Sequence, residues 1–340
     1  MKTIQLLYIG NKLSQHGFTK TTIETLGSFL EQEGYRMRYA SNKKNQMLRF
    51  LDMAWAVVQN RKTADFVIID TYSTFSFYYA WTVSQLCRLF GLKYIPILHG
   101  GNLPHRLSTH PKLAKMIFNH AFVNVAPSGY LKAAFEERGF TKLLFIPNTL
   151  NLEDYPFQAE RATTVPKLLW VRSFAHLYNP KMAIDVLKQL KQTHPQAQLC
   201  MVGPDKDGSL QATRKYAHEL GVAVTFTGKM SKEDWIKKSQ EYNIFINTTN
   251  FDNTPVSVME AMCLGLPVVT TNVGGIPFLL AHGKTALLVE AGNVLQMTQA
   301  IQNLMDDQNL RNSLIYNGRA YAEHFDWKKV KEQWARLFKD

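Results

Sequence analysis

Cysteine is scarce in this chain. Three of its 340 residues are cysteines, and they show no spacing typical of a metal site. Cys87, Cys200 and Cys263 all lie in apolar segments, where a free thiol behaves as a small buried hydrophobe. This pattern argues against a disulfide-stabilised fold of the secreted type and predicts free thiols in a reducing compartment.

Long hydrophobic runs are also missing. No window approaches the roughly 18 apolar residues that a membrane-spanning helix requires. The first residues lead into a predicted strand, Ile4 to Ile9, and not into a signal peptide. We therefore expect a globular protein in the cytoplasm, and hydrophobic residues at 46% are sufficient for sizeable cores.

Acidic residues are the minority charge. The chain has 39 Lys and Arg against 27 Asp and Glu, and residues 1–155 hold 18 of the basic and 10 of the acidic ones. Such an excess can attract an anionic membrane, a phosphorylated substrate or nucleic acid, although a solvated basic face is the commonest outcome. No nucleic-acid-binding motif is present, so we predict no nucleic-acid partner. Peripheral contact with the inner face of an anionic membrane stays open as a second kind of interaction. The basic stretch from His105 to Phe122 is the candidate for it.

Predicted strands and helices alternate in two series along the chain. The length suggests about two domains, and the alternation is typical of α/β domains with doubly wound parallel sheets. We place an N-terminal domain at residues 1–160, a C-terminal domain at 161–325 and a terminal helix at 326–340. Ligands of such sheets bind at the carboxyl ends of the strands, so we expect the site in a cleft between the domains.

The most informative stretch runs from Asn247 to Gly275. Thr254 is a favourable N-cap, and Pro255 suits the first position of a helix because its missing N–H would have no partner there. The first amides of a helix are unpaired and carry the positive end of its dipole, so they can receive anionic oxygens. In this helix those amides belong to Val256, Ser257 and Val258.

A carboxylate and two glycines complete the stretch. Glu260 lies on the second turn of the predicted helix, and its carboxylate can accept two hydrogen bonds from a vicinal diol such as a ribose. Gly274 and Gly275 allow backbone to approach a ligand closely. Together these features indicate a bound sugar nucleotide. An ordinary αβ unit with a capped helix and a solvated Glu accounts for the same residues.

The same stretch resembles the signature of the retaining GT-B glycosyltransferases of family 4. That signature has an acidic residue, seven others, a Glu followed by Ala and a hydrophobic residue, a Gly-x-Pro-Val-Val turn and a Gly-Gly loop. The matching residues are Asp252, Glu260-Ala261-Met262, Gly265-Leu266-Pro267-Val268-Val269 and Gly274-Gly275. Two positions differ, because the first acidic residue is usually Glu and a Glu often follows the double glycine, where this chain has Ile276-Pro277-Phe278.

The resemblance implies roles for residues elsewhere. A His at the end of a strand contacts the transferred sugar in the family, and His99 has that position here, where a structural histidine bonded to its loop is the alternative. An Arg and a Lys hold the donor diphosphate, which indicates Arg172 and Lys181. The family's Lys usually lies closer to the Arg, and a solvated lysine is the alternative. The implied backbone contacts with the donor fall at Gly17, where a plain turn is the alternative, and at Gly228 and Met230.

The implied reaction moves a hexosyl group from a UDP- or GDP-linked sugar, with retention of anomeric configuration. The acceptor would be a glycan, as in polysaccharide biosynthesis, a lipid-linked molecule or a small molecule. Arg172, Lys181 and the helix amides would stabilise the departing diphosphate. Glu260 would hold the ribose, and Asp252 would support the sugar.

No metal or other cofactor is expected. Asp205 and Asp207 form an Asp-x-Asp that we assign to turn chemistry and not to a cation. Two other functions fit the same fold. One is a GT-B sugar-nucleotide epimerase or hydrolase, although the sequence offers no extra carboxylate pair for proton abstraction. The other is a catalytically silent sugar-nucleotide-binding module, which the departures at Asp252 and Phe278 favour.

Overall fold

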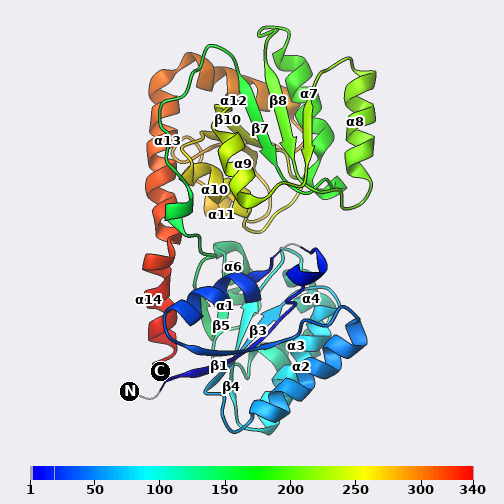
Figure 1. Cartoon of the computed structure of the whole chain (residues 1–340), viewed down its shortest axis with the longest axis vertical. Helices are drawn as coiled ribbons and strands as arrows, with labels where there is room; N and C mark the ends of the chain where they lie inside the picture. The colour runs from blue at the N-terminus through cyan, green and yellow to red at the C-terminus, as the bar shows by residue number, and fades with distance from the viewer. Residues whose placement is uncertain (1–2, 19, 340) are drawn as a thin grey trace. The chain divides into compact units, whose positions relative to one another are not determined.

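The computed structural model describes residues 3–18 and 20–339 and divides the chain into two compact units (Figure 1). Unit 1 consists of Met1–Thr149 and Trp327–Asp340, and unit 2 consists of Leu150–Asp326. The residues just before 160 therefore lie in unit 2. They are held there because Leu150 N donates to Phe325 O at 2.9 Å and because Tyr155 is buried in the unit 2 core.

Unit 1 is built on a parallel sheet of six strands in the order β2-β1-β3-β4-β5-β6. The strands are β1 (Gln5–Ile9), β2 (Arg36–Ala40), β3 (Phe66–Thr71), β4 (Lys93–Leu98), β5 (Asn124–Ala126) and β6 (Leu143–Phe145). Every residue of β3 is buried, as expected for a strand covered on both faces. The sequence analysis does not predict β2, because the exposed Arg36 and Arg38 of this edge strand interrupt its apolar pattern.

Helices cover both faces of the unit 1 sheet. They are α1 (Thr22–Gln32), α2 (Gln46–Asn60), α3 (Ser76–Leu89), α4 (Leu103–Thr109), α5 (Pro111–Phe118), α6 (Gly129–Glu136) and α14 (Trp327–Leu337). One core joins the sheet to α1 and α14, and another joins it to α2 and α3. The ring of Trp327 stacks on Phe29 at 4.9 Å, and its indole nitrogen donates to Glu33 at 3.1 Å. The last helix therefore completes a core that begins at the start of the chain.

Unit 2 contains a second parallel sheet of six strands, in the order β12-β11-β10-β7-β8-β9. The strands are β7 (Lys167–Val171), β8 (Gln198–Val202), β9 (Thr225–Gly228), β10 (Ile244–Asn247), β11 (Val268–Thr271) and β12 (Leu287–Val289). The helices are α7 (Pro180–Leu190), α8 (Ser209–Glu219), α9 (Lys232–Ser239), α10 (Val256–Cys263), α11 (Ile276–Leu279), α12 (Val294–Asp306) and α13 (Gln308–Ala322). Cores lie on both faces of this sheet as well.

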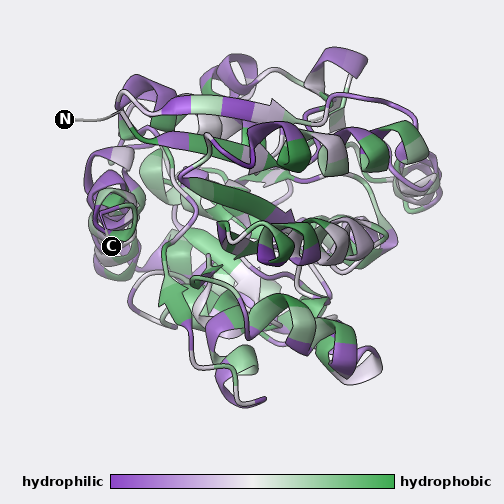
Figure 2. Cartoon of the chain, turned by 90° about the horizontal axis from the view of Figure 1, so that it is seen from below, coloured by the Kyte–Doolittle hydropathy of each residue, from purple (hydrophilic) through white to green (hydrophobic). Residues whose placement is uncertain are grey.

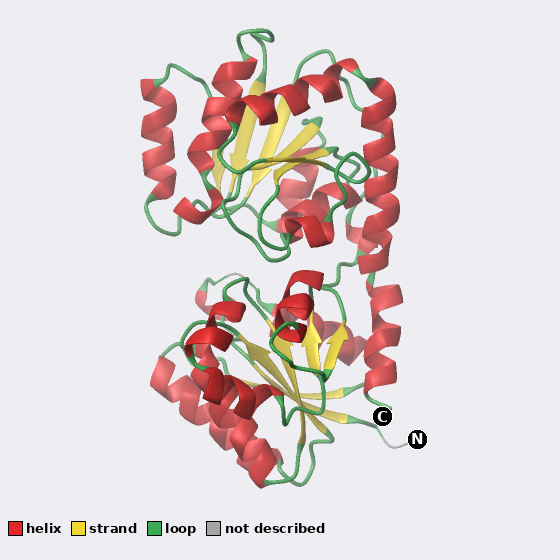
Figure 3. Cartoon of the chain, turned by 180° about the vertical axis from the view of Figure 1, so that it is seen from behind, coloured by secondary structure: helices red, strands yellow, loops and turns green. Residues whose placement is uncertain are grey.

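The two units share one layered design. Figure 3 shows the strands of each unit between helices, and Figure 2 shows helices that carry both hydrophobic and hydrophilic colours. Amphipathic helices on both faces of a parallel sheet define a doubly wound α/β fold, so the predicted fold class is confirmed. Across residues 3–18 and 20–339, none of the helices has the length and apolar character needed to cross a membrane.

Candidate functional site

Helix α10 begins one residue later than the sequence predicts. Pro255 is the N-cap, with φ −69° and ψ 106°, and Thr254 makes no capping hydrogen bond. The predicted cap at Thr254 is wrong because the extended ψ of Pro255 keeps this residue outside the helix. The Pro255 carbonyl accepts hydrogen bonds from the amides of Val258 and Met259 at 3.1 and 3.3 Å. The Val258 amide, which was expected to be free, is therefore already paired.

The start of α10 still has unused hydrogen-bonding groups. The amides of Val256 and Ser257 have no acceptor among the described residues. The hydroxyl oxygens of Thr254 and Ser257 are buried, again without a partner in that part of the chain. A buried polar group left unpaired costs about 1–3 kcal/mol. Donors gathered at the positive end of a helix are suited to an anionic oxygen.

The double glycine supports the loop that precedes α10. A Cβ atom on Gly274 would lie 2.3 Å from Asp252 O, and one on Gly275 would lie 1.9 Å from Asn253 O. Gly275 N also donates to Asp252 O at 2.8 Å. The close approach that these glycines permit is thus to the protein's own backbone, where the sequence analysis expected a ligand.

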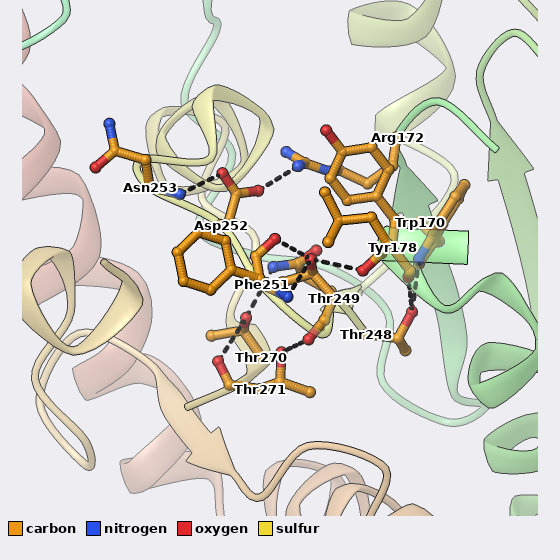
Figure 4. Close-up of polar contacts among 12 residues, drawn as sticks. Trp170, Arg172, Tyr178, Thr248, Thr249, Phe251, Asp252, Asn253, Thr270 and Thr271 are labelled. Atoms are coloured by element: carbon orange, nitrogen blue, oxygen red, sulfur yellow. Dashed lines mark hydrogen bonds and ion pairs between the residues drawn. The ribbon is translucent and has the colours of Figure 1, made fainter. Parts of the chain in front are cut away.

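Arg172 and Asp252 form an ion pair at the carboxyl ends of β7 and β10 (Figure 4). Both side chains are mostly buried, with exposed fractions of 11% and 14%. The guanidinium lies 4.0 Å from the centre of the Tyr178 ring, and Asp252 Oδ1 accepts from Asn253 N at 2.8 Å. These contacts fix one positive and one negative group side by side.

Threonines hold the loop that carries Asp252 (Figure 4). Thr248 Oγ1 accepts from the Trp170 indole at 3.0 Å and donates to Tyr178 O at 2.9 Å. Thr271 Oγ1 donates to Thr249 O at 2.6 Å. Because these hydroxyls are buried and paired, the loop is fixed between β7 and β11. These threonines were not assigned from the sequence, although Thr248 directly follows β10 and Thr271 ends β11.

Glu260 lies in a mostly buried polar group. Tyr155 Oη donates to its Oε1 at 2.7 Å, and Lys232 Nζ lies 3.7 Å from the same oxygen. Burial raises the pKa of the Glu260 carboxyl, while the hydrogen bond from Tyr155 and the charge of Lys232 oppose that rise. Burial and the neighbouring Glu260 also raise the pKa of Tyr155. Tyr155 was not predicted as a site residue because its acidic, proline-containing segment, residues 153–164, is typical of a linker between domains.

The remaining predicted donor contacts lie in other surroundings. Lys181 is exposed on α7, and its Nζ lies 5.1 Å from the centre of the Tyr216 ring. Neither a hydrogen bond nor an ion pair joins the side chain of Lys181 to another described residue, and the Tyr216 ring is its neighbour. Gly228 O accepts from Gly203 N at 2.9 Å, and Met230 packs against the unit 2 core. Within the described chain, neither a hydrogen bond nor an ion pair links these three predicted residues to Arg172.

In unit 1, His99 is buried beside an acid that the sequence analysis did not single out. His99 Nε2 lies 2.9 Å from Asp70 Oδ1, which also accepts from Tyr8 Oη at 3.0 Å. The Tyr72 ring stacks on His99 at 4.8 Å. In a neutral ring, the proton that pairs with Asp70 is on Nε2, and Nδ1 is then an acceptor. Asp70 lies one residue before the end of β3, the strand next to that of His99, so the strand-end rule already used for His99 could have found it.

Gly17, also in unit 1, follows the turn Ser14–His16 with φ +83°, and a Cβ there would meet nothing within 4 Å. Its local role is that of a turn residue that favours glycine.

Turn chemistry accounts for the Asp-x-Asp, as predicted. Asp205 Oδ1 accepts from Gly208 N at 3.0 Å, and Asp207 accepts from His176 N at 3.0 Å and from Ser209 N at 3.2 Å. The hydrogen bond from the Ser209 hydroxyl lowers the pKa of Asp207 most, and the hydrogen bonds from the His176 and Ser209 amides lower it further. Within the described ranges, His, Cys, Asp and Glu do not gather in threes as a metal site would require.

Residues 152–321 match the family model described as Glycosyl transferases group 1. Among curated proteins, glycogen synthase of Mycobacterium tuberculosis is 24% identical over 204 residues, covering 59% of this chain and 49% of that protein. D-inositol 3-phosphate glycosyltransferase of Corynebacterium jeikeium is 26% identical over 178 residues, covering 50% of this chain and 42% of that protein. The chain spans about half the length of these curated relatives.

Solved structures share the whole fold. Sucrose-phosphate synthase from Thermosynechococcus elongatus superposes with a TM-score of 0.82 at 17% identity, covering 99% of this chain and 98% of that one. Anabaena Alr3699/HepE in complex with UDP-glucose superposes with a TM-score of 0.77 at 17% identity, covering 99% of each chain. At these identities the likeness establishes the fold alone.

Proposed function

The chain belongs to the glycosyl transferases group 1 family, and from this premise we propose that it transfers a sugar from a nucleoside diphosphate sugar to an acceptor. The donor is UDP- or GDP-linked, and the anomeric configuration is retained. The acceptor is a glycan, a lipid-linked molecule or a small molecule. The three free, buried cysteines suit a reducing compartment such as the cytoplasm.

The observation that carries this proposal is the set of unused groups at the start of α10. The free amides of Val256 and Ser257 and the buried hydroxyls of Thr254 and Ser257 lie in the same short loop-to-helix segment as Asp252. A diphosphate offers oxygens that would pair all of these donors. Glu260 follows on the next turn of the same helix, where its carboxylate can accept from a ribose diol.

Arg172 and Asp252 have complementary roles in the proposal. Cleavage of the donor bond places negative charge on the departing diphosphate and positive charge on the sugar ring. Arg172 stabilises the first and Asp252 the second, so their ion pair is exchanged for substrate charges during the reaction. Lys181 adds positive charge near the diphosphate only if its side chain leaves the Tyr216 ring.

His99 contacts the transferred sugar in this proposal, as the resemblance implies. The hydrogen bond to Asp70 fixes the ring and makes Nδ1 the nitrogen that can accept from a sugar hydroxyl. Asp70 is then a positioning residue. Gly17, Gly228 and Met230 are proposed as backbone contacts with the donor, on the strength of the family resemblance alone.

The test is a screen of UDP- and GDP-sugars by thermal shift, followed by mass spectrometry of the products formed with a panel of acceptors. Glu260→Ala and Arg172→Ala should each reduce transfer strongly while circular dichroism stays unchanged, and the exposed Glu219→Ala serves as the control. Full activity in either site variant rejects the assigned roles. Stabilisation by a nucleotide sugar with no product favours the silent binding module. NMR of the product's anomeric proton tests retention separately.

A further inference from the structure

The outer face of α2 is apolar. Met47, Leu48, Leu51 and Trp55 have exposed fractions of 63%, 58%, 57% and 58%. Their positions, at i, i+1, i+4 and i+8, place them on one side of the helix. We call these four residues the α2 face. They form the densest group of exposed large hydrophobic side chains in the described part of the chain.

The opposite side of α2 is already buried. Met53, Ala56 and Val57 pack in the core that joins α2 to α3 and the sheet. A helix at the surface of a soluble protein normally has a polar outer side, whereas α2 is apolar on both sides. Figure 1 shows α2 on the outside of unit 1, with α3 beside it. An apolar face of this kind indicates an interaction surface.

Cations bracket the α2 face. Lys43 and Lys44 precede the N-cap residue Asn45, Arg61 and Lys62 directly follow the helix, and all four are exposed. Asp52 is the only acid on the helix itself. An occupant that covers the face must therefore tolerate two positive charges at each end, and a negatively charged occupant is favoured.

The first pair of lysines is held in place by the helix. Arg49 is buried, and its Nη1 donates to Lys43 O at 3.0 Å and to Lys44 O at 3.3 Å. Tyr79 Oη donates to Gln46 O at 3.2 Å. The backbone that carries the cations is thus fixed to the same helix as the apolar residues.

We propose that the α2 face docks on a membrane surface that contains anionic lipids. Leu51 and Trp55 enter the boundary between headgroups and acyl chains, and the four cations bind lipid phosphates. A second copy of this chain fits less well. Two α2 helices packed face to face, parallel or antiparallel, would bring cationic ends together. The proposal stands apart from sugar transfer, because it concerns binding to a surface.

The α2 face is a different segment from the stretch that the sequence indicated for membrane contact. Between His105 and Phe122, the apolar side chains of Leu107, Ala114 and Ile117 are buried in a core of unit 1. The basic residues of that stretch lie at the surface, whereas these apolar side chains do not. The contact expected there stays a prediction, and the apolar side that it would need faces inward.

Co-sedimentation with vesicles tests the proposal on the full chain. Vesicles of phosphatidylcholine alone are compared with vesicles of equal parts phosphatidylcholine and phosphatidylglycerol. The protein should pellet with the anionic vesicles and be released by high salt. Lys43→Gln with Lys44→Gln should weaken binding about 25-fold, since each cation near an anionic surface strengthens binding about fivefold.

Matched variants distinguish vesicle binding through the α2 face from nonspecific binding by other exposed residues. Leu51→Gln with Trp55→Gln should abolish pelleting, while Leu295→Gln, 67% exposed on α12, should not change it. The charge control is Lys188→Gln with Lys237→Gln, two exposed lysines of unit 2. All the substituted side chains are exposed, so circular dichroism and the urea midpoint should match the wild type.

Fluorescence adds a readout of insertion. Brominated acyl chains should quench the wild type, and Trp55→Phe should lose most of this quenching while still binding vesicles. The proposal is overturned if neutral vesicles bind equally well, or if Leu51→Gln with Trp55→Gln pellets like the wild type. It is also overturned if the α2 face proves to be buried in a lipid-free dimer that the same double variant dissociates.

Discussion

Replacing Glu260 by Gln removes a charge and leaves the shape of the side chain almost unchanged. In the structure, Oε1 of Glu260 accepts from Tyr155 Oη at 2.7 Å and lies 3.7 Å from Lys232 Nζ. The amide oxygen of Gln can still accept from Tyr155. We therefore expect the free energy of unfolding at neutral pH to change by no more than about 1 kcal/mol.

Nucleotide binding should respond much more strongly. The carboxylate of Glu260 offers both oxygens to a ribose diol, whereas the amide offers one. A hydrogen bond to a charged group contributes about 1.5–3 kcal/mol. Its loss should raise the Kd of UDP or GDP, whichever the protein binds, about 10- to 150-fold.

The pH dependence gives two trends of opposite sign. Because burial raises the pKa of Glu260 above its usual 4.5, the folded state favours the protonated form. This contribution to stability is fully present below about pH 4.5 and is lost as pH rises through the raised pKa. Nucleotide affinity should change the other way, rising with pH as the carboxylate forms. Both trends should be absent in Glu260→Gln.

Isothermal titration calorimetry and urea denaturation between about pH 5 and pH 8 measure both quantities. Glu219→Gln, an exposed change on α8, should match the wild type in each. An unchanged nucleotide Kd in Glu260→Gln, with the fold intact, would falsify the assignment of this carboxylate to the ribose. A parallel loss of stability and affinity would instead show that Glu260 is structural.

Three further predictions follow from contacts in the structure. Asp70→Asn removes the charged acceptor of His99, so kcat should fall about tenfold or more. The free energy of unfolding should fall by about 1–3 kcal/mol. Unchanged kinetics would contradict the positioning role. Gly275→Ala should weaken nucleotide binding in calorimetry, because its Cβ would meet backbone oxygen at 1.9 Å, whereas the helical Gly318→Ala should be tolerated, with its nearest atom at 3.4 Å. Burial raises the pKa of Cys263 to about 12, so a thiol reagent at about pH 8 should label it only after unfolding; rapid labelling of the native protein would refute this.

The fold was predictable from local pattern, and the ends of elements were not. Apolar runs separated by amphipathic segments gave both sheets, because a strand covered on two faces must be apolar throughout. The exact start of α10 was missed because the ψ angle of Pro255 decides it, and ψ is not fixed by the residue type. The edge strand β2 was missed because its arginines face solvent.

The side-chain partners within the candidate site were not predictable from the sequence, and the assigned roles of its residues stay predictions. Arg172 and Asp252 were indicated by the family resemblance and Glu260 by its place on the helix, but nothing local reveals that Arg172 pairs with Asp252, far along the chain. Tyr155 lies in a segment whose composition suggests a linker, and only tertiary packing brings its hydroxyl to Glu260. Asp70 joins His99 because β3 and β4 are neighbours, which is a property of sheet order.

Helix α14 has a consequence for how the protein is made. Val330 and Trp334 lie in the same core as β1 and α1, yet the ribosome synthesises them after every residue of unit 2. Unit 2 is continuous, so its nascent chain can fold as soon as it emerges. Unit 1 must hold an unfinished apolar surface until α14 arrives, and during that interval it is the part of the polypeptide most exposed to aggregation and most in need of a chaperone.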